Sequence, residues 1–144
     1  MSETTQDEDE IIKKILEESK TIAVIGASAD EKDYSNRVVN YLLEVGYQIV
    51  PICEEEERFG VKCYPSIAEI PEDIKIDVVT VFLPSEEIPK IAEEAINRGV
   101  KYIWLQRGIT HSQVAKMAKS LGTIVIQDRC IMTCLLYTSP SPRD

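Results

Sequence analysis

Apolar residues recur in five short runs along the chain, and polar residues rarely interrupt them. The runs occupy residues 21–26, 47–52, 76–84, 100–106 and 123–128. Nearly continuous apolar runs of this length predict strands that are covered on both faces, as in a parallel sheet.

The segments between these runs carry apolar residues at helical spacing. One apolar stripe follows Ser85 and comprises Ile88, Ile91, Ala92, Ala95 and Ile96. Such a stripe predicts a helix that packs on a sheet. Further along, Thr110 and Gln113 stand at capping-box spacing and predict another helix start. A leading helix is also expected, because residues 11–16 carry isoleucine and leucine at the same spacing.

Strands that alternate with helices predict an α/β fold with a doubly wound, parallel, five-stranded sheet between two helical layers, giving three layers in all. We expect the strand order 3-2-1-4-5, with right-handed crossovers. Ligands bind such sheets at the carboxyl ends of the strands, where the connections diverge to opposite faces. In the expected order this point lies at the ends of strands one and four.

The chain of 144 residues suits one domain, which we place at residues 10–133. Residues 1–9 are polar and acidic, so their composition predicts disorder. Residues 134–144, "CLLYTSPSPRD", resemble the translation of a transposon-end adapter used for sequencing libraries. We interpret this tail as a sequencing-adapter artefact, exclude it from fold reasoning and expect the authentic chain to continue beyond Thr133.

Charge and composition narrow the function classes. The formal net charge of −9 argues against a nucleic-acid partner. A membrane is not expected either, because no apolar run approaches the roughly 20 residues that span a bilayer. The four cysteines show no C-x-x-C spacing, and only His111 could supply an imidazole ligand, so neither a metal site nor a disulfide framework is predicted. The cysteines are Cys53, Cys63, Cys130 and Cys134. A reducing, cytoplasmic location is therefore expected.

The loop after the first strand, "GASADEKDYSNR", is the candidate ligand site. Gly26 permits a tight turn, and Ala27 and Ser28 are small enough for a ligand to approach closely. Ser35 is a candidate N-cap, so the amides of the following helix could receive a phosphate, and Arg37 adds positive charge. One glycine where a dinucleotide fingerprint has three indicates a wider mouth and a bulkier ligand than a nicotinamide dinucleotide.

Six ordered segments resemble one protein family. They are "IAVIGAS", "SNRVVNYLLEVGYQIVPI", "CYPSIAEIP", "VVTVFLPSEEIP", "YIWLQRGI" and "QDRC", within about residues 20–133. The chain resembles the small stand-alone CoA-binding proteins, which are similar to the CoA-binding domain of the succinyl-CoA synthetase alpha subunit. The resemblance implies a Rossmann-like domain that binds coenzyme A or an acyl-CoA.

The resemblance also implies site residues, in three groups. The phosphate loop would consist of Gly26, Ala27, Ser28 and Arg37. The groove wall after strand three would consist of Phe82, Leu83 and Pro84. The contacts after strand four would come from Leu105, Gln106 and Gly108. In the synthetase, the catalytic phosphohistidine belongs to another domain, so no catalytic residue is carried over. One departure follows strand two, where Cys53 and Glu54 replace the Asn-Pro that is usual in the family.

We therefore expect a non-catalytic carrier or sensor of coenzyme A. Two alternatives stay open. One is an NAD(P)-dependent oxidoreductase or nucleotide-binding subunit, with Glu54 as the acid that binds a ribose. The other is a protein-interaction module with a vestigial groove, favoured by the acidic residues 54–57. A homodimer or another protein partner is compatible with each.

Overall fold

The structure is a computed structural model that describes residues 2–138, with side-chain surroundings for residues 10–136. Two of its short elements, η1 and η2, are 3-10 helices. The elements in order are α1 (Ser2–Glu18), β1 (Thr21–Ile25), α2 (Tyr34–Glu44), β2 (Gln48–Ile52), β3 (Glu57–Arg58), β4 (Val61–Lys62), η1 (Ile67–Glu69), β5 (Val78–Val81), η2 (Ser85–Glu87), α3 (Ile88–Arg98), β6 (Tyr102–Leu105), α4 (Ser112–Ser120), β7 (Ile124–Ile126) and α5 (Ile131–Thr138).

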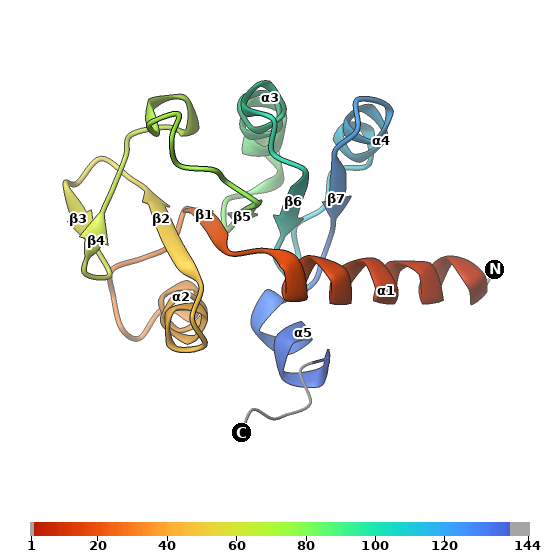
Figure 1. The fold of residues 1–144 in the computed structure, drawn as a ribbon, viewed down its shortest axis with the longest axis horizontal. Coiled ribbons are helices and arrows are strands. Elements are labelled where there is room, and N and C mark those ends of the chain that lie inside the picture. The colour runs from red at the N-terminus through yellow and green to blue at the C-terminus, as the bar shows by residue number, and fades with distance from the viewer. Residues whose placement is uncertain (1, 139–144) are drawn as a thin grey trace.

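The five predicted strands form one parallel sheet, which confirms the doubly wound α/β fold (Figure 1). Strands β3 and β4 form a separate antiparallel hairpin beyond β2. The sheet order is β2-β1-β5-β6-β7, so the expected order 3-2-1-4-5 is wrong. The third long strand, β5, pairs with β1 and leaves β2 at the edge.

Pro51 gives the physical reason for this order. It lies within β2 opposite Val24 of β1, and its carbonyl accepts a hydrogen bond from the Tyr64 N–H on the side away from β1. A proline has no N–H to offer a strand on that side, so proline is confined to edge strands. An internal β2, as the expected order required, would have left a gap in the ladder at Pro51.

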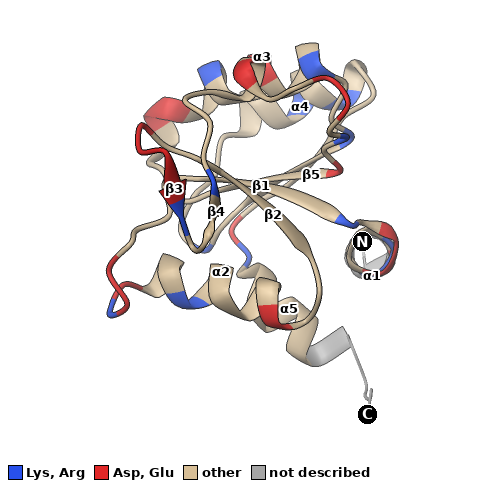
Figure 2. Ribbon diagram, turned by 60° about the vertical axis from the view of Figure 1, so that its left-hand side comes forward, with Lys and Arg blue, Asp and Glu red and all other residues tan. Residues whose placement is uncertain are grey.

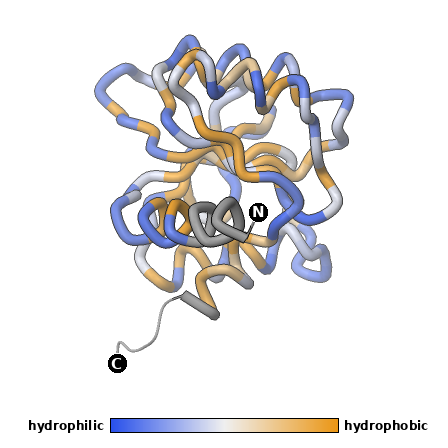
Figure 3. Tube along the Cα trace, turned by 90° about the vertical axis from the view of Figure 1, so that its right-hand side faces the viewer, coloured by the Kyte–Doolittle hydropathy of each residue, from blue (hydrophilic) through white to orange (hydrophobic). Residues whose placement is uncertain are grey.

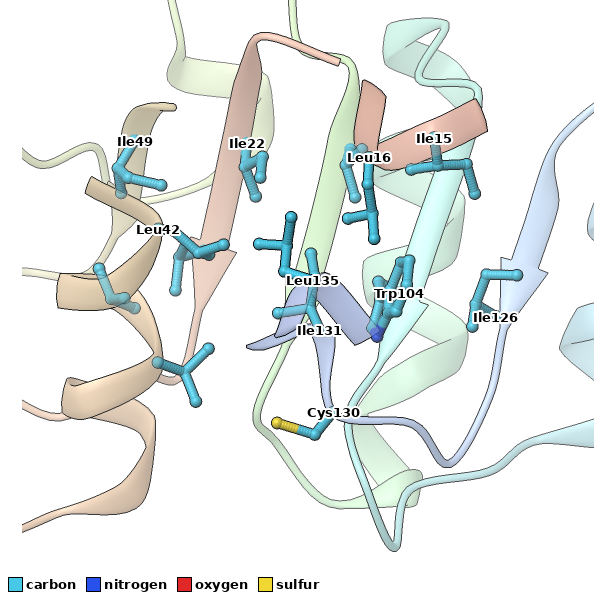
Figure 4. Packing of buried hydrophobic residues seen from close by; sticks show 14 of the residues in the cluster. Ile15, Leu16, Ile22, Leu42, Ile49, Trp104, Ile126, Cys130, Ile131 and Leu135 are labelled. Carbon is cyan, nitrogen blue, oxygen red and sulfur yellow. The ribbon is translucent and has the colours of Figure 1, made fainter. Parts of the chain in front are cut away.

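Helices cover both faces of the sheet. Helices α1, α2 and α5 lie on one face, and α3, α4 and η1 lie on the other (Figure 1). On the first face, Trp104 is fully buried among side chains from three helices, including Ile15, Ile131 and Leu135 (Figure 4). Figure 3 shows the apolar strands between helices whose outer surfaces are hydrophilic.

Both ends of the described chain are helical. Helix α1 begins at Ser2, so residues 2–9 are helical where composition predicted disorder. At the other end, α5 runs through Thr138, and Leu135 packs in the core. The adapter origin of residues 134–144 stays a prediction, and residues 139–144 lie outside the described residues.

Helix α4 begins differently from the prediction. Its N-cap is His111, whose Nδ1 accepts a hydrogen bond from the Val114 N–H at 3.3 Å. The capping box between Thr110 and Gln113 therefore does not form, because imidazole takes the role of the threonine hydroxyl one residue later. Within residues 2–138, no helix combines the length and the apolar character that crossing a membrane requires.

Candidate functional site

The point where the connections diverge lies between β1 and β5. The chain leaves β1 toward α2 on one face and leaves the neighbouring strand β5 toward α3 on the other (Figure 1). This corrects the expected position between strands one and four, because β5 stands between those two strands. Loops 26–33 and 82–87 therefore flank the crevice in which such sheets bind ligands.

Gly26 and Leu83 meet across this crevice. The backbone of Gly26 has φ +87°, and a Cβ there would lie 2.8 Å from Leu83 Cγ and 3.2 Å from the carbonyl carbon of Phe82. Both the conformation and the available space therefore require glycine. Phe82 and Leu83 are half-buried, whereas Pro84 is exposed at the start of η2.

Hydrogen bonds between residues close in the sequence hold the rest of the first loop. The Ser28 N–H donates to Ser35 Oγ at 2.9 Å, and Asn36 Nδ2 donates to the Ser28 carbonyl at 2.8 Å. The Asp30 N–H donates to Ser28 Oγ at 3.0 Å. Ala27 and Ser35 are buried, so these residues shape the loop from within.

The N-cap of α2 is Asp33, and the prediction of Ser35 was wrong. Asp33 Oδ1 accepts from both the Ser35 N–H at 2.8 Å and Ser35 Oγ at 2.7 Å. The bond from Ser35 Oγ, and to a lesser extent the bond from the Ser35 N–H, hold the pKa of the Asp33 carboxyl below its usual value. The Asp33 carboxylate therefore already occupies an amide that we expected to receive a phosphate.

Arg58 contacts this loop directly, and the charge of Arg107 acts near its end. Arg58 Nη1 donates to the Ala27 carbonyl at 2.6 Å, and Arg58 Nη2 lies 3.1 Å from Glu55 Oε1. From the β6 side, the positive charge of Arg107 acts on Tyr34 at the start of α2. Arg37, by contrast, is exposed and lines a groove with Asn40 and Met132. In Figure 2, β3 carries one acidic and one basic residue, and acidic residues precede it.

The residues after β6 have different roles. Leu105, the last residue of β6, is fully buried in the core under α3 and α4. The Gly108 N–H donates to Asp128 Oδ1 at 2.6 Å, which joins the β6 and β7 loops. Gln106 Oε1 accepts from the Ile131 N–H at 3.2 Å, whereas the buried Gln106 Nε2 has no partner among the described residues.

Cys130 joins α5 to α2 at the same edge of the sheet. The Tyr34 hydroxyl donates a hydrogen bond to Cys130 Sγ. Burial alone would raise the pKa of the Cys130 thiol, but hydrogen bonds from Tyr34, Thr133 and Met132 lower it below its usual value. Burial, followed by this contact, raises the pKa of Tyr34.

The structure places the predicted site residues in several parts of the molecule. Six of them gather at the crevice between β1 and β5, and two more stand at the end of β6 next to α5. Of the other three, Pro84 is exposed in the loop that flanks this crevice, Arg37 is exposed on α2, and Leu105 is in the core. The contacts of Arg58 with Ala27 and of Tyr34 with Cys130 were missed, because each joins segments that lie far apart in the sequence.

A doubly wound parallel sheet with its loops gathered at the switch point defines the class of Rossmann-like ligand-binding domains. The chain belongs to a particular family of this class, described as the CoA binding domain, whose model matches residues 20–135. This confirms the resemblance that the six sequence segments indicated.

Individual relatives are of two sizes. The uncharacterized protein YneT of Bacillus subtilis is 39% identical over 121 residues, covering 83% of this chain and 88% of YneT. The ADP-forming acetate–CoA ligase of Methanocaldococcus jannaschii is 35% identical over 89 residues, which is 61% of this chain but 12% of the ligase. The crystal structure of Prb, the protein PH1109 redesigned for binding, superposes with a TM-score of 0.87 at 36% identity and covers 94% of this chain and 95% of Prb.

Proposed function

We propose that the chain binds coenzyme A or an acyl-CoA at the crevice between β1 and β5, and that it acts as a carrier or sensor without catalysing a reaction. The family supports coenzyme A as the ligand. The ligase contains far more chain than this domain, so its activity is not assigned here.

The observation that carries the proposal is the unpartnered amide nitrogen of Gln106. A buried donor without an acceptor is costly, and native proteins rarely leave one unexplained. The Gln106 N–H lies 3.4 Å from the Val81 carbonyl, so this residue stands beside the end of β5 and the crevice. The pantetheine arm of coenzyme A contains two amides, and one of their carbonyls would satisfy Gln106 Nε2.

The charges around the crevice fit the phosphates of coenzyme A. Arg58 contacts the loop that begins at Gly26, and the charge of Arg107 acts on Tyr34 at the start of α2. Arg58 also pairs with Glu55, which offsets one of the four carboxylates of the acidic run 54–57.

Titration calorimetry on the full chain tests this function. We expect heat with coenzyme A at one site per chain, weaker binding of pantetheine because it lacks the phosphates, and no displacement of coenzyme A by NAD. Absence of heat with both coenzyme A and acetyl-CoA at near-millimolar concentration, from folded protein, would overturn the proposal. Stronger binding of NAD than of coenzyme A would favour the oxidoreductase alternative.

One substitution locates the phosphates. Arg58→Gln should weaken coenzyme A binding by about fivefold to thirtyfold, because it removes a charge-assisted contact of about 1–2 kcal/mol. Lys101→Gln is the matched control, since it removes the same charge from an exposed residue next to the amino end of β6. Equal effects of the two substitutions would show that net charge, and not Arg58, matters.

A further inference from the structure

Two cysteines lie side by side beyond the end of β2. Cys53 directly follows β2, and Cys63 directly follows β4 of the hairpin. The Cys53 N–H donates to the Tyr64 carbonyl at 2.9 Å, and the Tyr64 N–H donates to the Pro51 carbonyl at 3.0 Å. The chain that returns from the hairpin is therefore bonded to the end of β2.

The two side chains also make contact. The thiol of Cys53 is close enough to raise the pKa of the Cys63 thiol through a hydrogen bond and through its charge, after burial as the first cause. Cys63 is 5% exposed, whereas Cys53 is half-buried and its Sγ lies 3.9 Å from the Glu55 carbonyl. A buried thiol thus stands directly behind a thiol that solvent can reach.

This dithiol is next to the residue that contacts the ligand loop. Arg58 lies between the two cysteines in the sequence, and its charge, like that of Glu55, acts on Cys63. Arg58 Nη1 in turn donates to the Ala27 carbonyl at 2.6 Å. One side chain therefore connects the dithiol with the crevice between β1 and β5.

We propose that Cys53 and Cys63 form a reversible disulfide that fixes Arg58 against the Ala27 carbonyl and thereby strengthens ligand binding. The oxidant is a low-molecular-weight disulfide. The effect on binding rests on the proposed function, whereas the formation of the bond does not. The disulfide closes a loop that contains Arg58, so the hairpin is restricted before the ligand binds. Such preorganisation increases the affinity for the ligand.

The reaction begins at the more exposed thiol. Cys53, as its thiolate, attacks one sulfur of the small disulfide, whose S–S bond breaks and releases a thiolate that takes up the proton. The Cys63 thiolate then attacks Sγ of Cys53 and expels the second small thiol. Two protein thiols lose two electrons and two protons, and one small disulfide becomes two thiols.

The surroundings of Cys63 change between the two steps. Burial, followed by the hydrogen bond and the charge of Cys53, raises the pKa of Cys63 to about 12. Once Cys53 carries a mixed disulfide, its charge and its hydrogen bond to Cys63 are gone. Burial still raises the pKa of Cys63, so we expect the second step to be slower than the first and to speed up at higher pH.

Peptide mapping tests the bond itself. The full chain is incubated with oxidised glutathione and digested with trypsin without reduction, which cleaves after Arg37, Arg58, Lys62 and Lys75. We expect peptide 38–58 linked to peptide 63–75, and separation of the two by dithiothreitol. The melting temperature of the oxidised chain should rise by roughly 5–10 °C, as expected for closing a short loop.

Two variants make this result decisive. Cys53→Ser and Cys63→Ala should each abolish the linked pair and the rise in melting temperature. Cys53 is half-buried, so its serine variant is the milder change and remains informative if Cys63→Ala does not fold. A persistent glutathione adduct on Cys53, or a link from either cysteine to peptide 130–143, would overturn the proposal.

Calorimetry tests the effect on binding. The oxidised chain should bind coenzyme A about threefold to tenfold more tightly than the reduced chain, and Arg58→Gln should remove this difference. Equal affinities with the disulfide formed would overturn the control of binding. If neither form binds coenzyme A, the proposed function fails, while peptide mapping still decides whether the disulfide exists.

Discussion

The two sides of the carboxyl edge are held together in different ways. On the β1 side, most hydrogen bonds of the loop join residues that are at most eight positions apart, such as Ser28 with Ser35 and Asn36, and Arg58 adds one bond from the hairpin to Ala27. On the β6–β7 side, they join Gly108 with Asp128 and Trp104 with Arg129, 20 and 25 positions apart. The Tyr34–Cys130 bond connects the two sides across 96 positions.

The two sides therefore depend on different parts of the chain for their structure. The β1 loop takes most of its hydrogen bonds from its own short sequence and from the start of α2. The β6–β7 side needs α5 in place, because Gln106 and Tyr34 both bond to the start of that helix. We therefore expect substitutions on the β1 side to act on the local backbone, and those on the other side to act on the docking of α5.

The largest effect is expected for Gly26→Ala. The substitution places a side chain at φ +87° and 2.8 Å from Leu83, so unfolding should become easier by about 2–4 kcal/mol. Gly108→Ala is the control from the β6 side, because its φ is +84° but nothing lies within 4 Å of the added Cβ. The control should cost about 1–2 kcal/mol in urea unfolding. Equal losses would show that the contact with Leu83 does not matter.

A smaller effect is expected for Gln106→Met, and it concerns the ligand. The substitution removes the unpartnered donor, so coenzyme A should bind about threefold to tenfold more weakly. Gln127→Met also removes a side-chain acceptor on this side, since Gln127 Oε1 accepts from the His111 N–H. Its affinity for coenzyme A should be unchanged in calorimetry. Unaltered binding in Gln106→Met would disconnect this residue from the ligand.

The bond that connects the two sides is tested by Tyr34→Phe. Losing the hydroxyl should reduce the free energy of unfolding by about 1 kcal/mol. It should also raise the pKa of the Cys130 thiol, because the Tyr34 hydrogen bond lowers it. The pH profile of Cys130 alkylation should then move to higher pH, whereas Tyr41→Phe should leave it in place. An unchanged profile in Tyr34→Phe would contradict the contact.

The same division explains what the sequence could reveal. Strand positions and the turn at Gly26 follow from local patterns, and the structure has a strand in each of the five apolar runs. The strand order depends on which distant segment pairs with β1, and the signal that could have decided it was Pro51. Apolar periodicity does not register such a missing donor.

The candidate site divides in the same way. Gly26, Ala27 and Ser28 were found from their spacing after the first strand. Asp33 was missed as the N-cap because Asp33 and Ser35 both suit that role, and the backbone decides between them. No local pattern relates Arg58 to Ala27 or Cys53 to Cys63, since only the folded hairpin brings them together.

The smallest effect is expected for Asp33→Asn, which tests the β1 side by pH. Because the folded pKa of Asp33 is lowered, the stability from its charge is complete above the ordinary aspartate pKa, near 4, and is lost as the pH falls through the lower folded value. Asparagine keeps the capping oxygen but has no charge to lose. Urea unfolding should therefore show wild type above Asp33→Asn at pH 6, and the two should converge near pH 2. A constant difference between pH 6 and pH 2 would mean that the carboxylate charge adds nothing to the cap of α2.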